Sequence, residues 1–421
     1  MRFLPALLVV GALSISTTAV PAADDAAASP TLGNPQMALI LSGLYYGDDT
    51  HGDGPALLAG VAGALPDPGV DGPAEGFNLG ESELGIFSTV DPYLDAYANI
   101  SFSADAVGVE EAAFVTRALP AGWQLRGGKF LSGFGYQNGK HAHAWDFTDQ
   151  NLAYSALVGG EGLKDTGLQV TWLPPLDTYL QLGAEVLQGD QEKFGAATDL
   201  QEVADTLAVP LAALPPLDRH GPQLFIAFAK VAPDIGAANA LQLGVSYATH
   251  RSQQEVQASG SDLLYADGDA GLLGLEAIWK RTATGNYGVG SARVQAEYLR
   301  LEKNLDIVFD TVAADVGKTV TGTQDGFYIQ GVYGFAPRWE GGLRYDATGM
   351  TNDVATAGTT AGLGNSSRLS AEFPFRPSEF SYLRLQFSEA SVVDASGTQN
   401  DFSQLMIQYN LSLGAHGAHA F

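Results

Sequence analysis

Hydrophobic and polar residues alternate one by one along many stretches of the chain. Between Leu94 and Ser103 the even positions are apolar or small and the odd positions are polar. Between Gln404 and Leu413 the odd positions carry the large apolar and aromatic side chains. A period of two places the two kinds of residue on opposite faces of a β-sheet. The pattern therefore predicts strands with one apolar and one polar face.

About 16 segments of this kind occur, each near the ~9–11 residues that a strand needs to cross a bilayer at a tilt. They are expected at residues 36–47, 77–90, 94–103, 108–118, 123–132, 166–173, 178–188, 222–231, 240–249, 271–281, 291–301, 326–335, 338–348, 366–375, 380–388 and 404–413. Long connections are expected at 48–76, 133–165, 189–221, 250–269, 302–325 and 349–365, and most of the others are short. Long outer loops and short periplasmic turns are the layout of an outer-membrane barrel.

Four tryptophans support this topology. Trp123, Trp172, Trp279 and Trp339 fall at the short-turn ends of predicted strands, on the apolar face, and Trp145 falls in a long connection. Such a row is typical of an aromatic girdle at a membrane interface. A soluble β-sandwich, the alternative, would have to bury its apolar faces against a second sheet. The fold class predicted is all-β, a transmembrane antiparallel β-barrel of about 16 strands.

Both ends of the chain resemble targeting signals. A short cationic start, an apolar stretch from Leu4 to Val20 and small residues before Asp24 predict a signal peptide at residues 1–23, with a membrane anchor as the alternative. Residues 24–35 are expected to be a short periplasmic leader, and residues 36–421 a single barrel. The tail 414–421, which ends on Phe421, resembles an outer-membrane insertion signal, with an ordinary final strand and a loose tail as the alternative. We expect the outer membrane of a Gram-negative bacterium.

Composition narrows the function. The chain has 421 residues, no Cys and a net charge of -26. The negative charge argues against nucleic acid as a partner. It would either attract cations to the surface or serve only to keep the protein soluble. Thiol chemistry and Cys-based metal sites are excluded. The chain carries none of the common hydrolase, phosphate-loop or zinc-protease motifs. We therefore do not expect an enzyme.

The polar face of the predicted barrel carries charges that would line a water-filled lumen. Acidic residues come early and arginines late in the chain, so opposed walls would create a transverse field. Alternatively, the charges form cross-strand ion pairs that brace the wall. The expected pore-lining residues are Glu81, Glu83, Asp95, Glu111, Arg117, Arg126, Arg338, Arg344, Arg368 and Arg384.

The connection 133–165 follows the fifth predicted strand and is rich in aromatic and amide side chains. We expect it to fold inward and narrow the pore, by analogy with porins of this size. Its apolar anchors would be Phe134, Tyr136, Trp145, Phe147 and Tyr154.

The same connection holds a candidate metal site. His141 and His143 are two residues apart, so an extended backbone would project both imidazoles to one side. With a carboxylate from Asp146, Glu81 or Glu83 they would suit weak, transient Zn²⁺ binding. The alternative is that both His residues only form hydrogen bonds in a structural loop.

Several motifs resemble a family of bacterial outer-membrane proteins described as zinc-regulated outer-membrane receptors, sometimes as porins. They include Phe77-Asn-Leu-Gly-Glu-Ser-Glu-Leu84, Gly128-Lys-Phe-Leu-Ser-Gly-Phe-Gly-Tyr136 and His141-Ala-His-Ala-Trp-Asp-Phe147. The resemblance implies zinc-linked transport, and in some members an energy-transducing partner. A receptor of that kind carries an N-terminal plug inside a barrel of about 22 strands. Too few residues precede the first strand here for such a plug.

Together these observations predict a porin-like channel for small solutes, with cations or zinc species as candidates. The alternative is a receptor that binds zinc or a zinc complex through its outer loops. No cofactor is expected to be required. The expected partners are outer-membrane lipid and small solutes or metal ions, and a homotrimer is expected only by analogy with porins.

Overall fold

The computed structural model describes residues 34–63, 72–104, 106–191, 193–194, 201, 204–205, 207–214, 221–259, 262–311 and 314–414. The predicted signal peptide, most of the predicted leader and the tail that ends on Phe421 lie outside the described residues. The first strand begins at Gln36, the position expected from the sequence.

Within the described residues all 19 strands form one sheet. Of these, β3 continues β2 after a break at Gly80 and Glu81, so the two count as one barrel strand. The strands β15 and β16 form a side hairpin. The closed barrel therefore has 16 strands. The barrel strands are β1 (Gln36–Asp48), β2 (Gly76–Leu79) with β3 (Ser82–Thr89), β4 (Leu94–Phe102), β5 (Val107–Thr116), β6 (Trp123–Leu131), β7 (Lys164–Trp172), β8 (Tyr179–Leu187), β9 (Leu224–Ala232), β10 (Asn239–Ser259), β11 (Asp262–Arg281), β12 (Ala292–Asp310), β13 (Thr319–Ala336), β14 (Trp339–Thr348), β17 (Ser366–Ser378), β18 (Ser381–Val393) and β19 (Gln399–Gly414).

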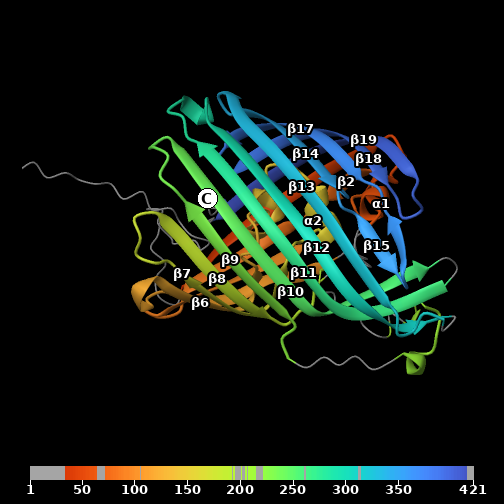
Figure 1. Ribbon diagram of the computed structural model, residues 1–421. Helices are drawn as coiled ribbons and strands as arrows, with labels where there is room; N and C mark the ends of the chain where they lie inside the picture. Colours follow the sequence, from red (N-terminus) through yellow and green to blue (C-terminus); the bar gives the residue numbers. More distant parts are fainter. Residues whose placement is uncertain are drawn as a thin grey trace, which may run out of the picture.

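The first strand closes the barrel by pairing antiparallel with both of its neighbours. Leu39 of β1 lies opposite Leu84 of β3, and Leu41 lies opposite Leu411 of β19. Every other neighbouring pair is also antiparallel, and the strands tilt across the barrel (Figure 1). The predicted all-β barrel and its number of strands are confirmed.

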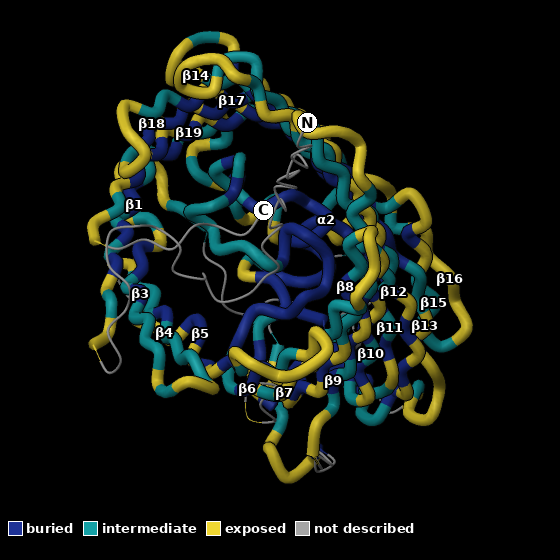
Figure 2. Tube along the Cα trace, turned by 90° about the vertical axis from the view of Figure 1, so that its left-hand side faces the viewer, coloured by how far each residue is buried: buried dark blue, intermediate teal, exposed yellow. Residues whose placement is uncertain are grey.

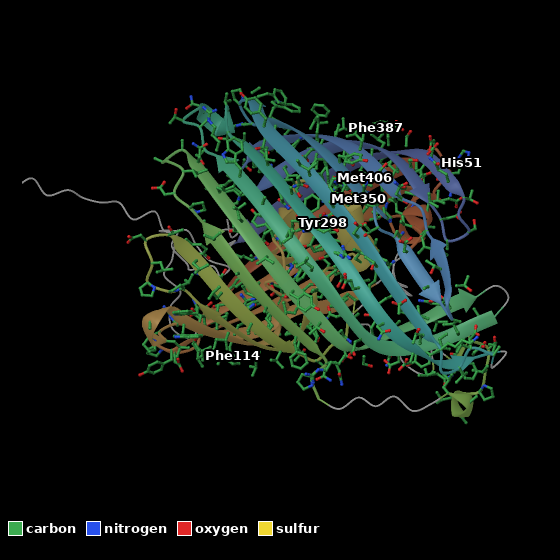
Figure 3. All side chains as sticks on the ribbon, in the orientation of Figure 1. His51, Phe114, Tyr298, Met350, Phe387 and Met406 are labelled. Carbon is green, nitrogen blue, oxygen red and sulfur yellow. The ribbon has the colours of Figure 1, made fainter. Side chains whose placement is uncertain are left out.

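The barrel has its apolar side chains outside and its polar ones inside. On β19, Leu405, Ile407 and Tyr409 are exposed, whereas Gln404 and Gln408 are buried. Figure 3 labels Phe387 of β18, which is exposed on the outer surface, and Met406 of β19, an apolar side chain that is buried. An outer surface of this kind is stable in lipid, because the apolar side chains meet hydrocarbon and the closed sheet leaves no unpaired edge.

The tryptophans lie where the membrane topology places them. Trp123 opens β6 directly opposite Trp172, which closes β7, and the two rings stack 5.4 Å apart. Trp339 opens β14 and packs on Phe375 with ring centroids 4.7 Å apart. These aromatic pairs stand at the short-turn end, as expected for a periplasmic girdle.

Two predicted long loops are wrong, because residues 250–269 and 302–325 are largely strand. The strands β10 to β13 run for 18 to 21 residues. Their extensions stay paired because apolar residues still alternate on the inner face, where Leu264, Leu305 and Val320 form a buried cluster. A side hairpin, β15 (Asp353–Thr356) and β16 (Thr359–Gly362), pairs with the outer part of β13.

Helical structure is confined to short pieces. Two short α-helices can be followed from end to end within the described part of the chain, α1 (Gly54–Ala59) and α2 (Leu152–Leu157). Single 3-10 turns occur at Pro120–Gly122, Gln137–Gly139, Ala142–Ala144, Leu211–Ala213 and Asn286–Gly288. None of the described helices is long and apolar enough to cross a membrane.

Candidate functional site

Residues 132–163, which connect β6 to β7, fold into the barrel, and we call them the inner loop. Figure 2 looks along the barrel and shows this buried segment inside the ring of strands. Its first turn crosses to the far wall: the backbone N–H groups of Tyr136 and Gln137 each donate to Glu297 of β12 at 2.8 Å. Lys230 of β9 donates to the carbonyl oxygen of Gly135 at 2.6 Å.

Aromatic side chains anchor the inner loop. Phe134, Phe147 and Tyr154 are at most 1% exposed, and Tyr136 and Trp145 are also buried, as expected. Phe134 and Tyr154 pack against an unusual part of the wall, where β8 to β13 carry apolar residues on the inner face, whereas Phe147 lies against the Arg344 guanidinium. Fully burying a side chain of this size stabilises by roughly 1.5–3 kcal/mol. The loop is therefore packed against the wall like part of a protein core.

The helix α2 sits at the centre of this contact. It packs against β12, β13 and β14, and Asn151 caps it by accepting a hydrogen bond from the backbone N–H of Tyr154 at 3.0 Å. The Tyr154 hydroxyl in turn donates to Glu297 at 2.9 Å. The same carboxylate thus holds both the first turn of the inner loop and α2. The only signal of this role in the sequence is the inward position of Glu297 on its strand.

The two histidines contact the acidic wall, which we define as Glu83 of β3 and Glu111 of β5. His141 Nε2 lies 2.9 Å from a Glu111 oxygen, and Nδ1 of both His141 and His143 faces one Glu83 oxygen, at 3.5 and 3.2 Å. The imidazole rings stack with centroids 5.8 Å apart. Burial would lower the pKa of His141, but the hydrogen bond and charge of Glu111 and the charge of Glu83 outweigh it and raise the pKa to about 9.

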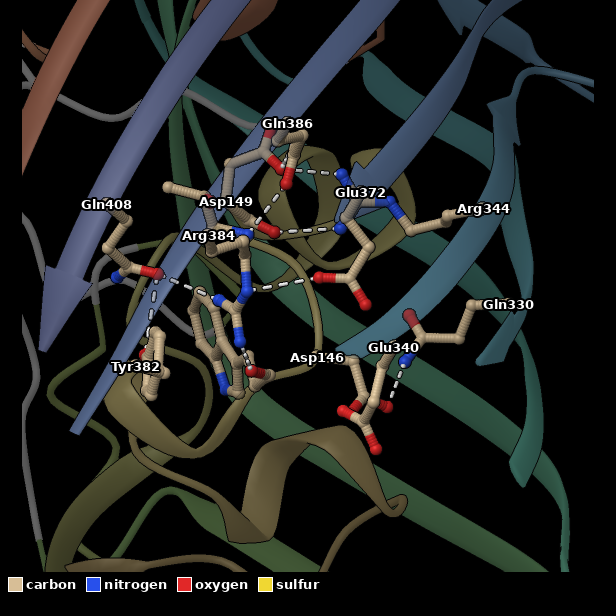
Figure 4. Close-up of polar contacts among 12 residues, drawn as sticks. Asp146, Asp149, Gln330, Glu340, Arg344, Glu372, Tyr382, Arg384, Gln386 and Gln408 are labelled. Atoms are coloured by element: carbon tan, nitrogen blue, oxygen red, sulfur yellow. Dashed lines mark hydrogen bonds and ion pairs between the residues drawn. The ribbon is translucent and has the colours of Figure 1, made fainter. Parts of the chain in front are cut away.

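The loop carboxylates contact the basic wall, which we define as Arg293 of β12, Arg344 of β14, Arg368 of β17 and Arg384 of β18. Figure 4 shows Asp149 with Arg344 and Gln386, whose nitrogens lie 2.6 and 2.7 Å from its Oδ1. Arg368 donates to its Oδ2. Burial would raise the pKa of Asp149, but Arg368 and Arg344 outweigh it and lower the pKa to about 2.

Asp146 and the loop backbone complete the contact with the basic wall. The Asp146 carboxylate accepts a hydrogen bond from Arg293 at 2.7 Å and another from Gln330 at 3.0 Å. Arg384 donates to the carbonyl oxygen of Trp145 at 2.8 Å. The charges of the inner loop therefore complement the two walls, with imidazoles on the carboxylates and carboxylates on the arginines.

The expected pore-lining residues do not all have the same role. Glu83, Glu111, Arg344, Arg368 and Arg384 face inward and hold the inner loop, whereas Arg126 is buried over the Phe130 ring. Asp95 and Arg117 pair with each other at 3.0 Å near the short-turn end.

The other two members of the set lie at a strand break and in a turn. Glu81 is exposed at the break between β2 and β3. Arg338 is exposed in the turn between β13 and β14, where its guanidinium lies over the Tyr287 ring. Arg338 therefore belongs to the turn and not to the inner wall of the barrel.

The predicted metal ligands are not brought together as one set. Asp146 contacts Arg293 and Gln330, while Glu83, the other carboxylate considered, is the one beside both imidazoles. Among the described residues, no group of three or more His, Cys, Asp or Glu side chains could hold a metal ion. A bound zinc ion would have to replace the contacts of the imidazoles with Glu83 and Glu111.

Solved structures with this fold are outer-membrane proteins. OprB of Pseudomonas putida has a TM-score of 0.55 at 11% identity, covering 90% of this chain and 94% of its own. The channel DcaP of Acinetobacter baumannii has a TM-score of 0.52 at 12% identity, covering 90% and 97%. OmpT of Vibrio cholerae, also solved in a trimer form, has a TM-score of 0.51 at 11% identity, covering 90% and 97%. The chain thus has the fold of outer-membrane porins and channels.

The sequence comparison finds a nearer relative. No protein-family model matches the chain. An uncharacterized protein of Aquifex aeolicus (strain VF5) is 36% identical over 354 residues, which are 82% of this chain and 70% of the relative. Identity at this level over most of both chains shows common descent, and the chain belongs to the same family as this Aquifex aeolicus protein.

Proposed function

We propose that the chain is a porin-like channel of the outer membrane, in which the inner loop narrows the passage for small solutes. The observation that carries the proposal is that one loop is bonded to opposite walls of the same barrel. His141 and His143 reach the acidic wall, and Asp146 and Asp149 reach the basic wall. A segment held at both walls must cross the lumen between them, so any solute has to pass beside it.

The charge pairing bears on which solutes pass. Opposed acidic and basic walls would create a strong transverse field in an empty barrel. Here the inner loop places opposite charges against both walls, which weakens that field. We propose small polar solutes as the general class. Passage of cations or zinc species is a narrower proposal, supported by the net charge of -26 and by the carboxylates beside the two imidazoles.

The second candidate is a receptor that captures a ligand outside the membrane. The observation in its favour is the extension of β10 to β13, which carries paired strands well beyond the membrane-spanning part. The resemblance to zinc-regulated outer-membrane receptors belongs to this candidate. A homotrimer is a proposal for either candidate.

Single-channel recording in planar lipid bilayers separates the two. A channel shows steady open current after insertion of the purified, heat-modifiable protein, and a closed receptor stays silent. The matched variants are Asp149→Ala, which removes a contact with the basic wall, and Asp401→Ala, an exposed site on β19. Current that changes with the first variant and not with the second supports the loop as the constriction.

A further inference from the structure

The outer face of the barrel carries a hollow that the proposed channel does not use. It has a volume of about 680 Å³ and lies over the extended parts of β10 to β13 and the hairpin β15–β16 (Figure 1). Most side chains that line it point outward, because they occupy alternate positions in register across six strands. The outward polar and aromatic residues are Tyr247, Thr249, Asp269, Glu302, Asn304, Thr321, Thr323, Asp353 and Thr360.

The position of the hollow relative to the membrane follows from the register. One row of outward residues across neighbouring strands consists of Tyr247, Leu273, Arg300 and Asp325. The rows on the periplasmic side of it are mainly apolar. The first of them contains Val245, Leu275 and Tyr298. The next row outward runs Thr249, Gly271, Glu302, Thr323 and Asp353, and every side chain in it is polar. The hollow therefore begins where the apolar band ends, at the level of the outer-leaflet headgroups.

The chemistry of the hollow is that of a surface for hydroxyl groups. Carboxylates, threonine hydroxyls and the amide of Asn304 accept and donate hydrogen bonds. Tyr247 is 51% exposed and leans across Gly271, where a Cβ would lie 2.5 Å from its hydroxyl oxygen. An exposed aromatic ring at the lower edge offers an apolar face and a polar tip, which suits the amphipathic faces of a sugar ring.

The charge of the hollow argues against a phosphate. Among the described residues, its outward side chains include the carboxylates of Asp269, Glu302 and Asp353 and no cation. The ammonium of Lys303 turns to the inner face and pairs with Glu255 at 2.6 Å. The nearby Arg300 is paired with Glu302 at 2.9 Å. An anionic group placed here would meet net negative charge.

We propose that this hollow binds the saccharide headgroup of a glycolipid in the outer leaflet, through the sugar hydroxyls. The acyl chains of such a lipid would lie against the apolar band directly below, where Val245 and Leu275 are exposed. A glycolipid would make both contacts. A free sugar could make only the contact with the hollow, and a plain phospholipid only the contact with the apolar band. The inference rests on the barrel and its orientation, and it holds whether or not the barrel conducts.

The test measures lipid bound to the purified full-length protein by native mass spectrometry, with lipopolysaccharide as the probe. Asn304→Trp fills the floor of the hollow, and Asp306→Trp is the control, two residues along the same strand and also exposed but outside the hollow. We expect Asn304→Trp to weaken binding at least roughly tenfold, with the control unchanged. Thr323→Trp repeats the test at a second position in case the first variant folds poorly.

Three further arms identify the chemistry. Dephosphorylated lipopolysaccharide and lipopolysaccharide with EDTA should bind wild-type protein as tightly as the untreated lipid, since the contact is to sugar hydroxyls. The free oligosaccharide should bind more weakly than the lipid, because it lacks the apolar contact. Loss of binding with EDTA or dephosphorylation would indicate a cation-bridged phosphate and overturn the proposal. Equal binding by the free oligosaccharide, or equal loss in the control variant, would also overturn it.

Discussion

His141 and Glu111 share a hydrogen bond of 2.9 Å that ties the inner loop to the acidic wall. The pKa of His141 is raised to about 9, well above the ordinary value of 6.5. A group whose pKa is raised on folding stabilises fully below its unfolded pKa, and that stabilisation is lost as the pH rises through the folded pKa. The contact is therefore intact near neutral pH.

The first prediction is a loss of stability between about pH 6.5 and pH 9, of at most about 3 kcal/mol for the His141 contact. The measurement is the free energy of unfolding in detergent and urea across this range, for wild type and His141→Gln. The variant should lose most of this pH dependence. Burial lowers the pKa of Lys140 to about 8. The loss of its proton above that pH therefore increases the free energy of unfolding, and it does so in both proteins. Identical profiles for the two proteins would contradict the role of His141.

The second prediction concerns Asp149, whose removal takes the loop carboxylate away from Arg344 and Arg368 but leaves both arginines paired with Asp346. Leaving a buried charge without any partner costs roughly 3–5 kcal/mol, so we expect a smaller cost here, and it falls on docking of the inner loop. Asp149→Ala should release residues 145–150 from the wall, which faster backbone hydrogen exchange in that segment would report. Exchange at the β18–β19 ladder should stay unchanged. Uniformly faster exchange over the whole barrel would point to general destabilisation instead.

The third prediction concerns zinc. Weak binding by His141 and His143, with Glu83 as the nearby carboxylate, stays a prediction from the sequence. If it is right, micromolar to millimolar Zn²⁺ reduces the single-channel current of wild type, because a metal in the inner loop obstructs the passage. The double variant His141→Ala with His143→Ala should be insensitive. A wild-type current that ignores Zn²⁺ would end the metal hypothesis.

The barrel was accessible to sequence reasoning because alternation has a direct physical meaning in a membrane. In a membrane the apolar face must meet lipid, as at Leu405, Ile407 and Tyr409. The number of alternating segments then predicts the number of strands. The sequence pattern does not predict the extensions of β10 to β13, because beyond the membrane the outer face turns polar, as at Glu302 and Asn304, and the inner face also carries polar residues such as Glu255. The pairing of Leu264 with its inner-face neighbours keeps them in strand.

The inner loop was predicted in outline but not in its partners. Its aromatic anchors and its histidines stood out by residue type, and all are buried or in contact with the wall. Asp146 was grouped with the histidines because it is close in sequence, yet its carboxylate binds Arg293 across the barrel. Contacts between residues 147 positions apart depend on how the loop crosses the lumen, which a local pattern does not specify.

The most direct test of the central claim is the single-channel conductance of a variant in which a short Gly-Ser linker replaces residues 137–149. This change removes His141, His143, Asp146 and Asp149 together and leaves the 16 strands intact. The account predicts steady current from wild type and a larger single-channel conductance from the variant, with both proteins heat-modifiable on a gel. Equal conductance in the two proteins, or a silent wild type, would contradict the inner loop as the constriction of a channel.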